Sequence, residues 1–202
     1  SGDWSSDVCS SDLDCLTRDF PPLECPWFAG ISVQYGINSL ASPEDLNVTT
    51  GEQWVAQGKV HTDLIIDPYE IYHTRYCGFD SFTNYLGSLS DSELLTMFLL
   101  GRQLSMSAIL VASSEKELDA AIATPARLIG LHEKDTFGAR LELEEICELA
   151  EMVPEEKFLL TRLEDPDREK LEMLSEAEVN AVIVSLDDYQ MNQKVLTEFF
   201  PR

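Results

Sequence analysis

From Ala29 to the C-terminus, short apolar segments alternate with longer amphipathic segments. The short segments are seven or eight residues long, and most are apolar at consecutive positions, which is typical of strands buried on both faces. The predicted strands cover residues 28–35, 59–66, 80–87, 107–113, 127–133, 157–163 and 180–186. The predicted helices cover residues 67–78, 90–104, 114–123, 143–152 and 167–178. The chain is therefore expected to repeat a strand-turn-helix unit.

Capping signals support these helix boundaries. Ser90 lies three residues before Glu93, and Ser114 lies three residues before Glu117. This is the spacing of a capping box, in which each side chain bonds the backbone of the other residue. Gly78 follows a predicted helix, as is typical of a helix C-terminus.

The segment that begins at Asp67 is predicted to be structural. Asp67 is expected to cap a helix and Pro68 to take its first position. We expect Tyr69 and Tyr72 to face the barrel.

Alternating strands and helices predict a parallel sheet. With residues 14–19 as a damaged first strand, the repeats reach eight, which predicts a (β/α)8 (TIM) barrel in one domain over residues 14–202. A doubly wound open sheet is the alternative. Residues 20–28 hold three prolines and are predicted to form a loop in place of the helix between the first two strands. Residues 46–58 are expected to form a loop with a short helical turn.

The first 13 residues, SGDWSSDVCSSDL, have no apolar period and no basic residue. They match the in-frame translation of DNA similar to a widely used short-read sequencing adapter. We interpret residues 1–13 as a non-native tail, to be set aside from the fold. The native chain is then expected to start near Asp14, N-terminally truncated, and different codons in the encoding DNA would contradict this.

The net charge of the chain limits which classes of partner are expected. The chain carries a formal net charge of -23, and the 189 residues after the tail carry -20, because the tail holds three acids and no base. Nucleic acid and anionic membranes repel such a chain, so neither is an expected partner. No apolar segment is long enough to span a bilayer. Four cysteines after the tail lack metal-binding spacing and predict a reduced cytoplasmic protein: Cys15, Cys25, Cys77 and Cys147.

Several segments in one collinear order resemble indole-3-glycerol-phosphate synthase, a tryptophan-pathway barrel family. The strongest is DLIIDPYEIYHTRYCGFDS at residues 63–81, which is similar to the family's RKDFIIDPYQIYEARAAGADA. Residues 31–46, 87–122, 126–135 and 179–186 also match family segments. The resemblance covers nearly all of the chain after the tail.

The family closes an indole ring with loss of carbon dioxide and water. The resemblance implies a general acid, carboxylates for developing positive charge, and a phosphate grip at the C-terminal ends of the strands. The family's catalytic positions fall at Cys15, Thr17, Thr62, Val111, His132 and Lys134. A Glu of the seventh strand falls at Leu160, Thr161 or Arg162, depending on register.

These positions have lost the family's Lys and Glu residues, with Lys134 and His132 as the remaining candidates for acid-base chemistry. Each general acid or base contributes roughly 10²–10⁴-fold to rate. The resemblance therefore predicts a divergent, noncatalytic barrel, a pseudoenzyme. The alternative is an active synthase or related carboxy-lyase with rearranged groups. A third interpretation is a decaying gene or a metagenomic fragment without selected function.

Polar residues gather at the ends of the third and sixth predicted strands: His61, Asp63, His132, Glu133, Lys134 and Asp135. His132 and Glu133 are adjacent on a strand and would point to opposite faces, so we expect no metal site there and no cofactor. Cys15 facing His132 is a candidate nucleophile-base pair.

The expected partners follow from the resemblance and from the predicted gap in the barrel wall. A small phosphorylated ligand at the barrel mouth would use Lys134 and Ser185, the latter near the family's phosphate-binding glycine. A protein partner, such as another tryptophan-pathway enzyme, or a homodimer would cover apolar surface beside the missing helix. Acid-rich residues 141–156 are predicted to form a solvated face, with a surface for a basic partner as the alternative.

Overall fold

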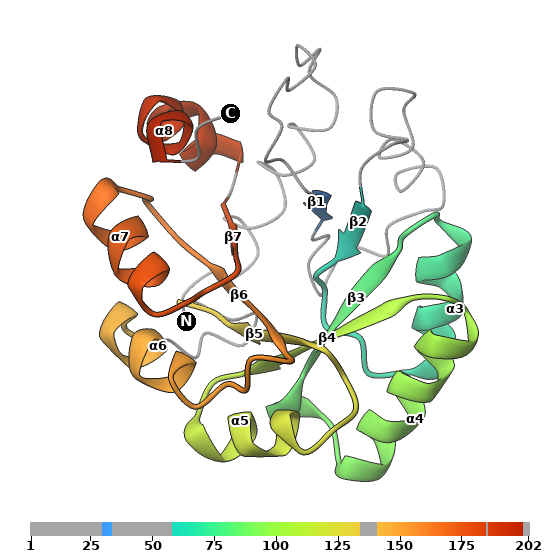
Figure 1. The fold of residues 1–202 in the computed structure, drawn as a ribbon. Coiled ribbons are helices and arrows are strands. Elements are labelled where there is room, and N and C mark those ends of the chain that lie inside the picture. The colour runs from blue at the N-terminus through green and yellow to red at the C-terminus, as the bar shows by residue number, and fades with distance from the viewer. Residues whose placement is uncertain (1–29, 34–57, 134–140, 185, 200–202) are drawn as a thin grey trace, which may run out of the picture.

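The computed structural model describes residues 30–33, 58–133, 141–184 and 186–199. Within these ranges the structure has seven strands, and a helix follows each strand from the second to the seventh (Figure 1). The strands are β1 (Gly30–Val33), β2 (Gly58–His61), β3 (Ser81–Tyr85), β4 (Ser107–Ala112), β5 (Leu128–Leu131), β6 (Phe158–Arg162) and β7 (Ala181–Ile183). The helices are α3 (Pro68–Tyr76), α4 (Asp91–Gln103), α5 (Glu115–Ile122), α6 (Leu143–Ala150), α7 (Arg168–Glu176) and α8 (Leu186–Phe199), with a 3-10 turn at Leu86–Ser88.

The strands form one parallel sheet whose spatial order follows the chain from β1 to β7. The sheet curls, and α3 to α7 lie along its outer side (Figure 1). This is the architecture of a (β/α)8 barrel, and it confirms that prediction. The doubly wound alternative is wrong, because such a sheet reverses its strand order and carries helices on both faces. The predicted first strand (14–19), the loop 20–28 and most of the loop 46–58 lie outside the described residues.

In the central strands, side chains alternate between two apolar layers, as strand geometry requires. The inner layer, enclosed by the curled sheet, consists of Tyr85, Ile109, Val111 and Leu160, with Val60, Leu64, Leu128, Ala181 and Ile183 packed against them. The outer layer joins the sheet to the helices. Its strand residues are Phe82, Ala108, Leu110, Ala112, Ile129, Leu131 and Leu159. Burial on both faces explains the consecutive apolar positions in the sequence.

The predicted caps form at the start of α4 and α5, with one difference. Ser90 and Glu93 make the full capping box. At α5 the Ser114 hydroxyl accepts from the Glu117 N–H, but the Glu117 carboxylate accepts from the N–H of Ser113 at 2.8 Å instead. The carboxylate thus satisfies a donor one residue earlier than a capping box would.

Helix α3 begins as predicted, but its tyrosines point the other way. Asp67 accepts from the Tyr69 N–H at 2.8 Å, and Pro68 takes the first turn. Tyr69 and Tyr72 are 72% and 52% exposed, so the prediction that they face the barrel is wrong. Ile71 is the large side chain that α3 buries against the sheet, and the tyrosines two residues before and one after it fall on the outer side.

Three helices end in the same motif. After α3, the N–H of Phe79 bonds the carbonyl of Thr74, with Gly78 at φ 84° between helix and strand, which confirms the predicted C-terminal glycine. Equivalent bonds close α4 and α7. There the left-handed position holds Ser105 (φ 57°) and Glu178 (φ 60°), which are not glycine.

None of the helices in the described part of the chain combines the length and apolar character that crossing a bilayer requires.

Replacing Ser105 or Glu178 by Gly should stabilise the fold by about 0.5–1 kcal/mol each. A left-handed conformation costs a side-chain-bearing residue roughly 1–2 kcal/mol, and the greater freedom of unfolded glycine offsets part of that. Gly78→Ala should destabilise by about 1 kcal/mol or more. Urea unfolding free energies measure all three. Ala120→Gly, on the exposed side of α5, is the control and should cost about 0.5–1 kcal/mol. Equal losses at all four positions would contradict the argument.

Candidate functional site

The parallel strands bring their C-terminal ends to one mouth, where barrels of this type carry their chemistry. Of the predicted site residues, four are described: Thr62 just after β2, Val111 on β4, His132 just after β5 and Leu160 on β6. All four side chains are buried. Val111 and Leu160 belong to the inner layer, and strand alternation places Thr62 on the same face as Val60 and Leu64.

Thr62 lies beside Tyr85. The Tyr85 hydroxyl donates to the Thr62 carbonyl at 3.2 Å, which joins the end of β2 to the end of β3. Sequence reasoning missed this tyrosine, although a phenol at the end of an apolar strand is a recognisable signal for a buried hydrogen bond.

Val111 and His132 meet over Gly130. A Cβ built on Gly130 would lie 3.1 Å from Val111 Cγ2 and 3.0 Å from His132 Cε1. The glycine leaves the space that the imidazole and the valine occupy. The structure therefore brings together two positions that are more than 20 residues apart in the sequence and were both predicted to be site positions.

Strand β6 is the seventh strand when the predicted strand at residues 14–19 is counted. Its side-chain alternation reduces the alternatives for the position of the family's seventh-strand Glu. Leu160 is in the inner layer, whereas Leu159 and Leu163 are in the outer layer. Thr161 lies between the inward positions and so shares the outward face, which removes it from the three alternatives. Leu160 and Arg162 remain as the two inward alternatives, and of these Leu160 carries an alkyl side chain without acid-base capacity.

His132 is buried at this mouth and uncharged. Its Nδ1 accepts from the N–H of Arg162 at 3.1 Å, so the ring proton is on Nε2. Burial first, and then the nearby Arg162 charge, lower the pKa of His132 from 6.5 to about 4. About one molecule in a thousand then carries the imidazolium at pH 7, so His132 is a poor proton donor there.

Glu133 makes a different set of bonds from its neighbour His132. Its Oε2 accepts from the N–H of Glu164 at 2.9 Å, and its Oε1 lies 3.8 Å from Lys170 Nζ. Lys170 also donates to the Glu164 carbonyl at 2.8 Å. These bonds tie the segment after β5 to the segment between β6 and α7. Among the described residues there is no group of three His, Cys, Asp or Glu side chains that could hold a metal.

His61 and Asp63 do not join His132, so the predicted polar cluster is split. His61 Nδ1 bonds Thr74 Oγ1 of α3 at 2.8 Å, and its Nε2 lies 3.2 Å from Asp63 Oδ2. The His61 ring is 5.1 Å from the Phe79 ring. The pair therefore lies in the outer layer, because His61 is one residue out of phase with Val60 and Thr62.

Four predicted residues lie outside the described ranges: Cys15, Thr17, Lys134 and Ser185. The Cys15–His132 pair stays a prediction, as do Lys134 and Ser185 as ligand-binding residues.

Lowering the pH should reduce the free energy of unfolding because of the lowered pKa of His132. The unfolded chain holds this group near pKa 6.5, so between pH 6.5 and pH 4 it binds a proton that the folded state does not. The stabilisation is complete above pH 6.5 and is lost as the pH falls towards 4, by about 3 kcal/mol in total. Urea unfolding across this range should show a smaller pH dependence for His132→Asn, which keeps an acceptor for the Arg162 N–H.

His73→Asn, at a half-buried position on α3, is the matched control and should keep the pH dependence of the parent protein. If the stability of His132→Asn kept the full pH dependence of the parent protein, the conclusion that His132 is buried and neutral would be contradicted.

Comparisons with known proteins agree with the barrel. A family model described as indole-3-glycerol phosphate synthase matches residues 43–196. The indole-3-glycerol phosphate synthase of Acetivibrio thermocellus is 30% identical over 177 residues, which cover 84% of this chain and 67% of that protein. The protein of that name from Legionella pneumophila (strain Lens) is 25% identical over the same shares of both chains.

The fold also matches solved structures at low identity. A mandelate oxidase variant with (S)-mandelic acid superposes with a TM-score of 0.59 at 10% identity, covering 83% of this chain and 62% of that one. This likeness shows the barrel fold alone. The chain spans about two thirds of the length of the relatives named above. Since the family model covers most of the chain and a relative is 30% identical over most of it, the chain belongs to the indole-3-glycerol phosphate synthase family.

Proposed function

We propose that this chain is a noncatalytic member of its family, a cytoplasmic barrel that keeps the scaffold without the indole-forming reaction. The observation that carries the proposal is the chemistry of the inward positions. Thr62, Val111 and Leu160 stand where the resemblance places ionisable groups, and none of the three can donate a proton at neutral pH. His132, at another of the positions that the resemblance makes catalytic, is neutral.

The inner layer around these positions also disfavours a replacement charge. Val111 and Leu160 pack with Tyr85 and Ile109 in a buried apolar cluster. Burying a charged group without a partner is costly, and an ionisable side chain there shifts its pKa until it is neutral. The low pKa of His132 is an instance of this effect.

A remaining role for the chain is binding. The mouth keeps Arg162, whose backbone N–H already bonds His132, and the proposed Lys134 and Ser185 would add further groups for a small phosphorylated ligand. A protein partner is the other form of the same proposal, in which the barrel acts as a docking module.

Purified protein should give no turnover of the family substrate, carboxyphenylamino deoxyribulose phosphate, in an indole-fluorescence assay. The family's general acids and bases are each worth roughly 10²–10⁴-fold, so their joint loss should leave no rate above background. The Acetivibrio thermocellus relative, assayed in parallel, is the positive control, and circular dichroism checks that the protein is folded.

Turnover that disappears in His132→Asn or Lys134→Met would contradict the proposal. It would mean that the family reaction continues on rearranged groups, which is the alternative interpretation.

Binding at the mouth can be tested with inorganic phosphate as the probe. Phosphate added at constant ionic strength should shift backbone amide NMR signals at the C-terminal ends of β6 and β7, near Arg162 and Val184, because these N–H groups surround the mouth. Chloride at the same ionic strength is the control. Signals that stay unmoved at both strands, or move equally with chloride, would exclude the ligand-binding form.

A further inference from the structure

Helices α3 and α4 pack side by side (Figure 1). Both carry large apolar side chains that are exposed. We name this surface the α3–α4 face. Its exposed apolar residues are Tyr69, Tyr72 and Tyr76 on α3 and Leu95 and Leu99 on α4. The spacing of three and four residues places each set along one stripe of its helix.

The barrel wall does not account for these side chains. Towards the sheet, α3 buries Ile71 and Thr74, and α4 buries Leu94, Met97 and Phe98. A helix in a barrel wall needs one apolar stripe, and its opposite side is usually polar. These two helices are apolar on both sides, and Tyr76 is left 79% exposed.

The face is also poor in acids, in a chain of net charge -23. The single acid of α3, Glu70, accepts from the N–H groups of Ile66 and Asp67 in its capping box. In α4, Asp91 and Glu93 lie in the first turn, and no acid follows up to Gln103. By contrast, α5, α6 and α7 carry Glu115, Glu117, Asp119, Glu144, Glu145, Glu148, Glu169, Glu172 and Glu176.

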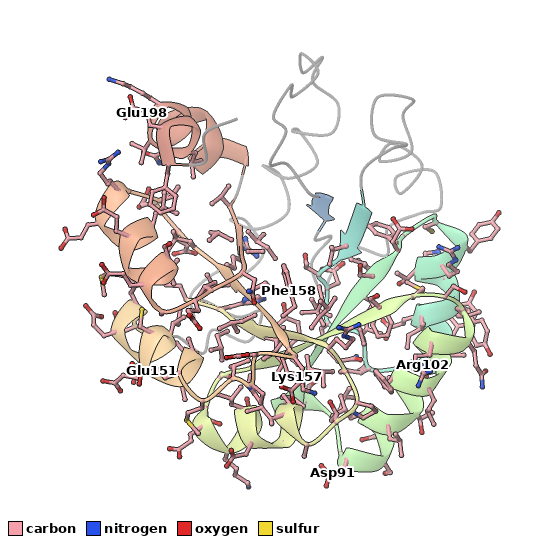
Figure 2. The ribbon with its side chains drawn as sticks, in the orientation of Figure 1. Asp91, Arg102, Glu151, Lys157, Phe158 and Glu198 are labelled. Atoms are coloured by element: carbon pink, nitrogen blue, oxygen red, sulfur yellow. The ribbon has the colours of Figure 1, made fainter. Side chains whose placement is uncertain are left out.

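Two arginines lie among the apolar side chains. Arg75 is exposed on α3, 3.7 Å from Asp80, and Arg102 lies 5.9 Å from the Phe98 ring on α4. Figure 2 shows Arg102 on the side of the molecule opposite Glu151, which directly follows the acid-rich helix α6. Tyrosine and arginine are the residue types that protein interfaces enrich.

We propose that the α3–α4 face is a self-association surface, on which a second copy of this chain packs the same face about a two-fold axis. Two copies of so acidic a chain repel one another over most of their surface. At this face acids are scarce, and apolar area can be buried without desolvating carboxylates. A two-fold axis sets the face against itself, which places arginines of one protomer near tyrosine rings of the other. The inference is independent of whether the barrel is catalytic.

The size of the face predicts a weak dimer. Helices of 9 and 13 residues are about 14 and about 20 Å long, and each is about 10 Å wide. Such a face is at the low end of interfaces, where roughly 800 Å² per partner is standard. We therefore expect micromolar or weaker association.

Sedimentation equilibrium on the full chain, from about 5 to about 500 µM, should show a monomer that shifts to a dimer as concentration rises. Raising the salt from about 50 to about 500 mM should strengthen the dimer several-fold, because salt screens the repulsion between net charges and leaves the apolar contact in place. A monomer at every concentration would overturn the proposal. Association that weakens with salt would overturn it too, because attraction between this face and an acidic helix would then hold the copies together.

Two variants test the face directly. Tyr76→Glu on α3 and Leu99→Glu on α4 should each weaken the dimer at least tenfold, by placing an acid in the contact. Met191→Glu on α8 is the matched control, because Met191 is also apolar and 70% exposed and the change adds the same charge. It should leave the dimer within twofold of the parent protein. Equal weakening by all three variants would overturn the proposal, and circular dichroism with thermal midpoints checks that each is folded.

Discussion

The structure depends on one constraint: the central strands of the curled parallel sheet, β3 to β6, bury both of their faces. Tyr85, Ile109, Val111 and Leu160 fill the inside, while Phe82, Leu110, Ile129 and Leu159 pack outward under the helices. A shift of one residue in any strand would exchange these two sets, so the register is strongly fixed. The sequence positions that face the mouth are fixed with it. This is why Thr62, Val111, His132 and Leu160 come from four strands and yet share one interior.

Because of the same constraint, the barrel can keep its fold when the ionisable residues of its interior are replaced. An inward position needs a side chain that fills its space, and an apolar side chain fills it without the cost of burying a charge. Replacing an ionisable group by Val111 or Leu160 therefore leaves the barrel intact. Each replacement also makes the interior less polar, which lowers the stability of any charge that remains. His132, bonded through Nδ1 to the backbone of Arg162 and neutral at pH 7, shows where this leads. A site that loses some of its charges becomes a poorer environment for the others.

Most of the fold was predictable because its signals are local. Consecutive apolar residues, Ser90 with Glu93, Asp67 before Pro68, and Gly78 each specify an element or its end within a few residues. The predictions that were wrong concern the direction in which a side chain points, not the type of element that carries it. Tyr69 and Tyr72 were expected to face the barrel, but α3 turns Ile71 inward instead. His61 was grouped with His132 because both end a strand, yet its phase along β2 points it at Thr74. Which groups meet across strands, as His132 and Val111 do over Gly130, requires the register, and the register is not local.

The layered construction also explains how one chain can hold such different surfaces. The inner and outer apolar layers cover both faces of the sheet. The solvent-facing side of each helix is therefore not needed to hold the barrel together. On α5, α6 and α7 that side carries acids, which repel other copies of the chain. On α3 and α4 it carries tyrosines and leucines instead, and these would be an aggregation hazard if the rest of the surface were neutral. The surrounding negative charge disfavours orientations in which the acids of one molecule face those of another. The acids on α5, α6 and α7 thus influence which surfaces of another molecule can contact the α3–α4 face.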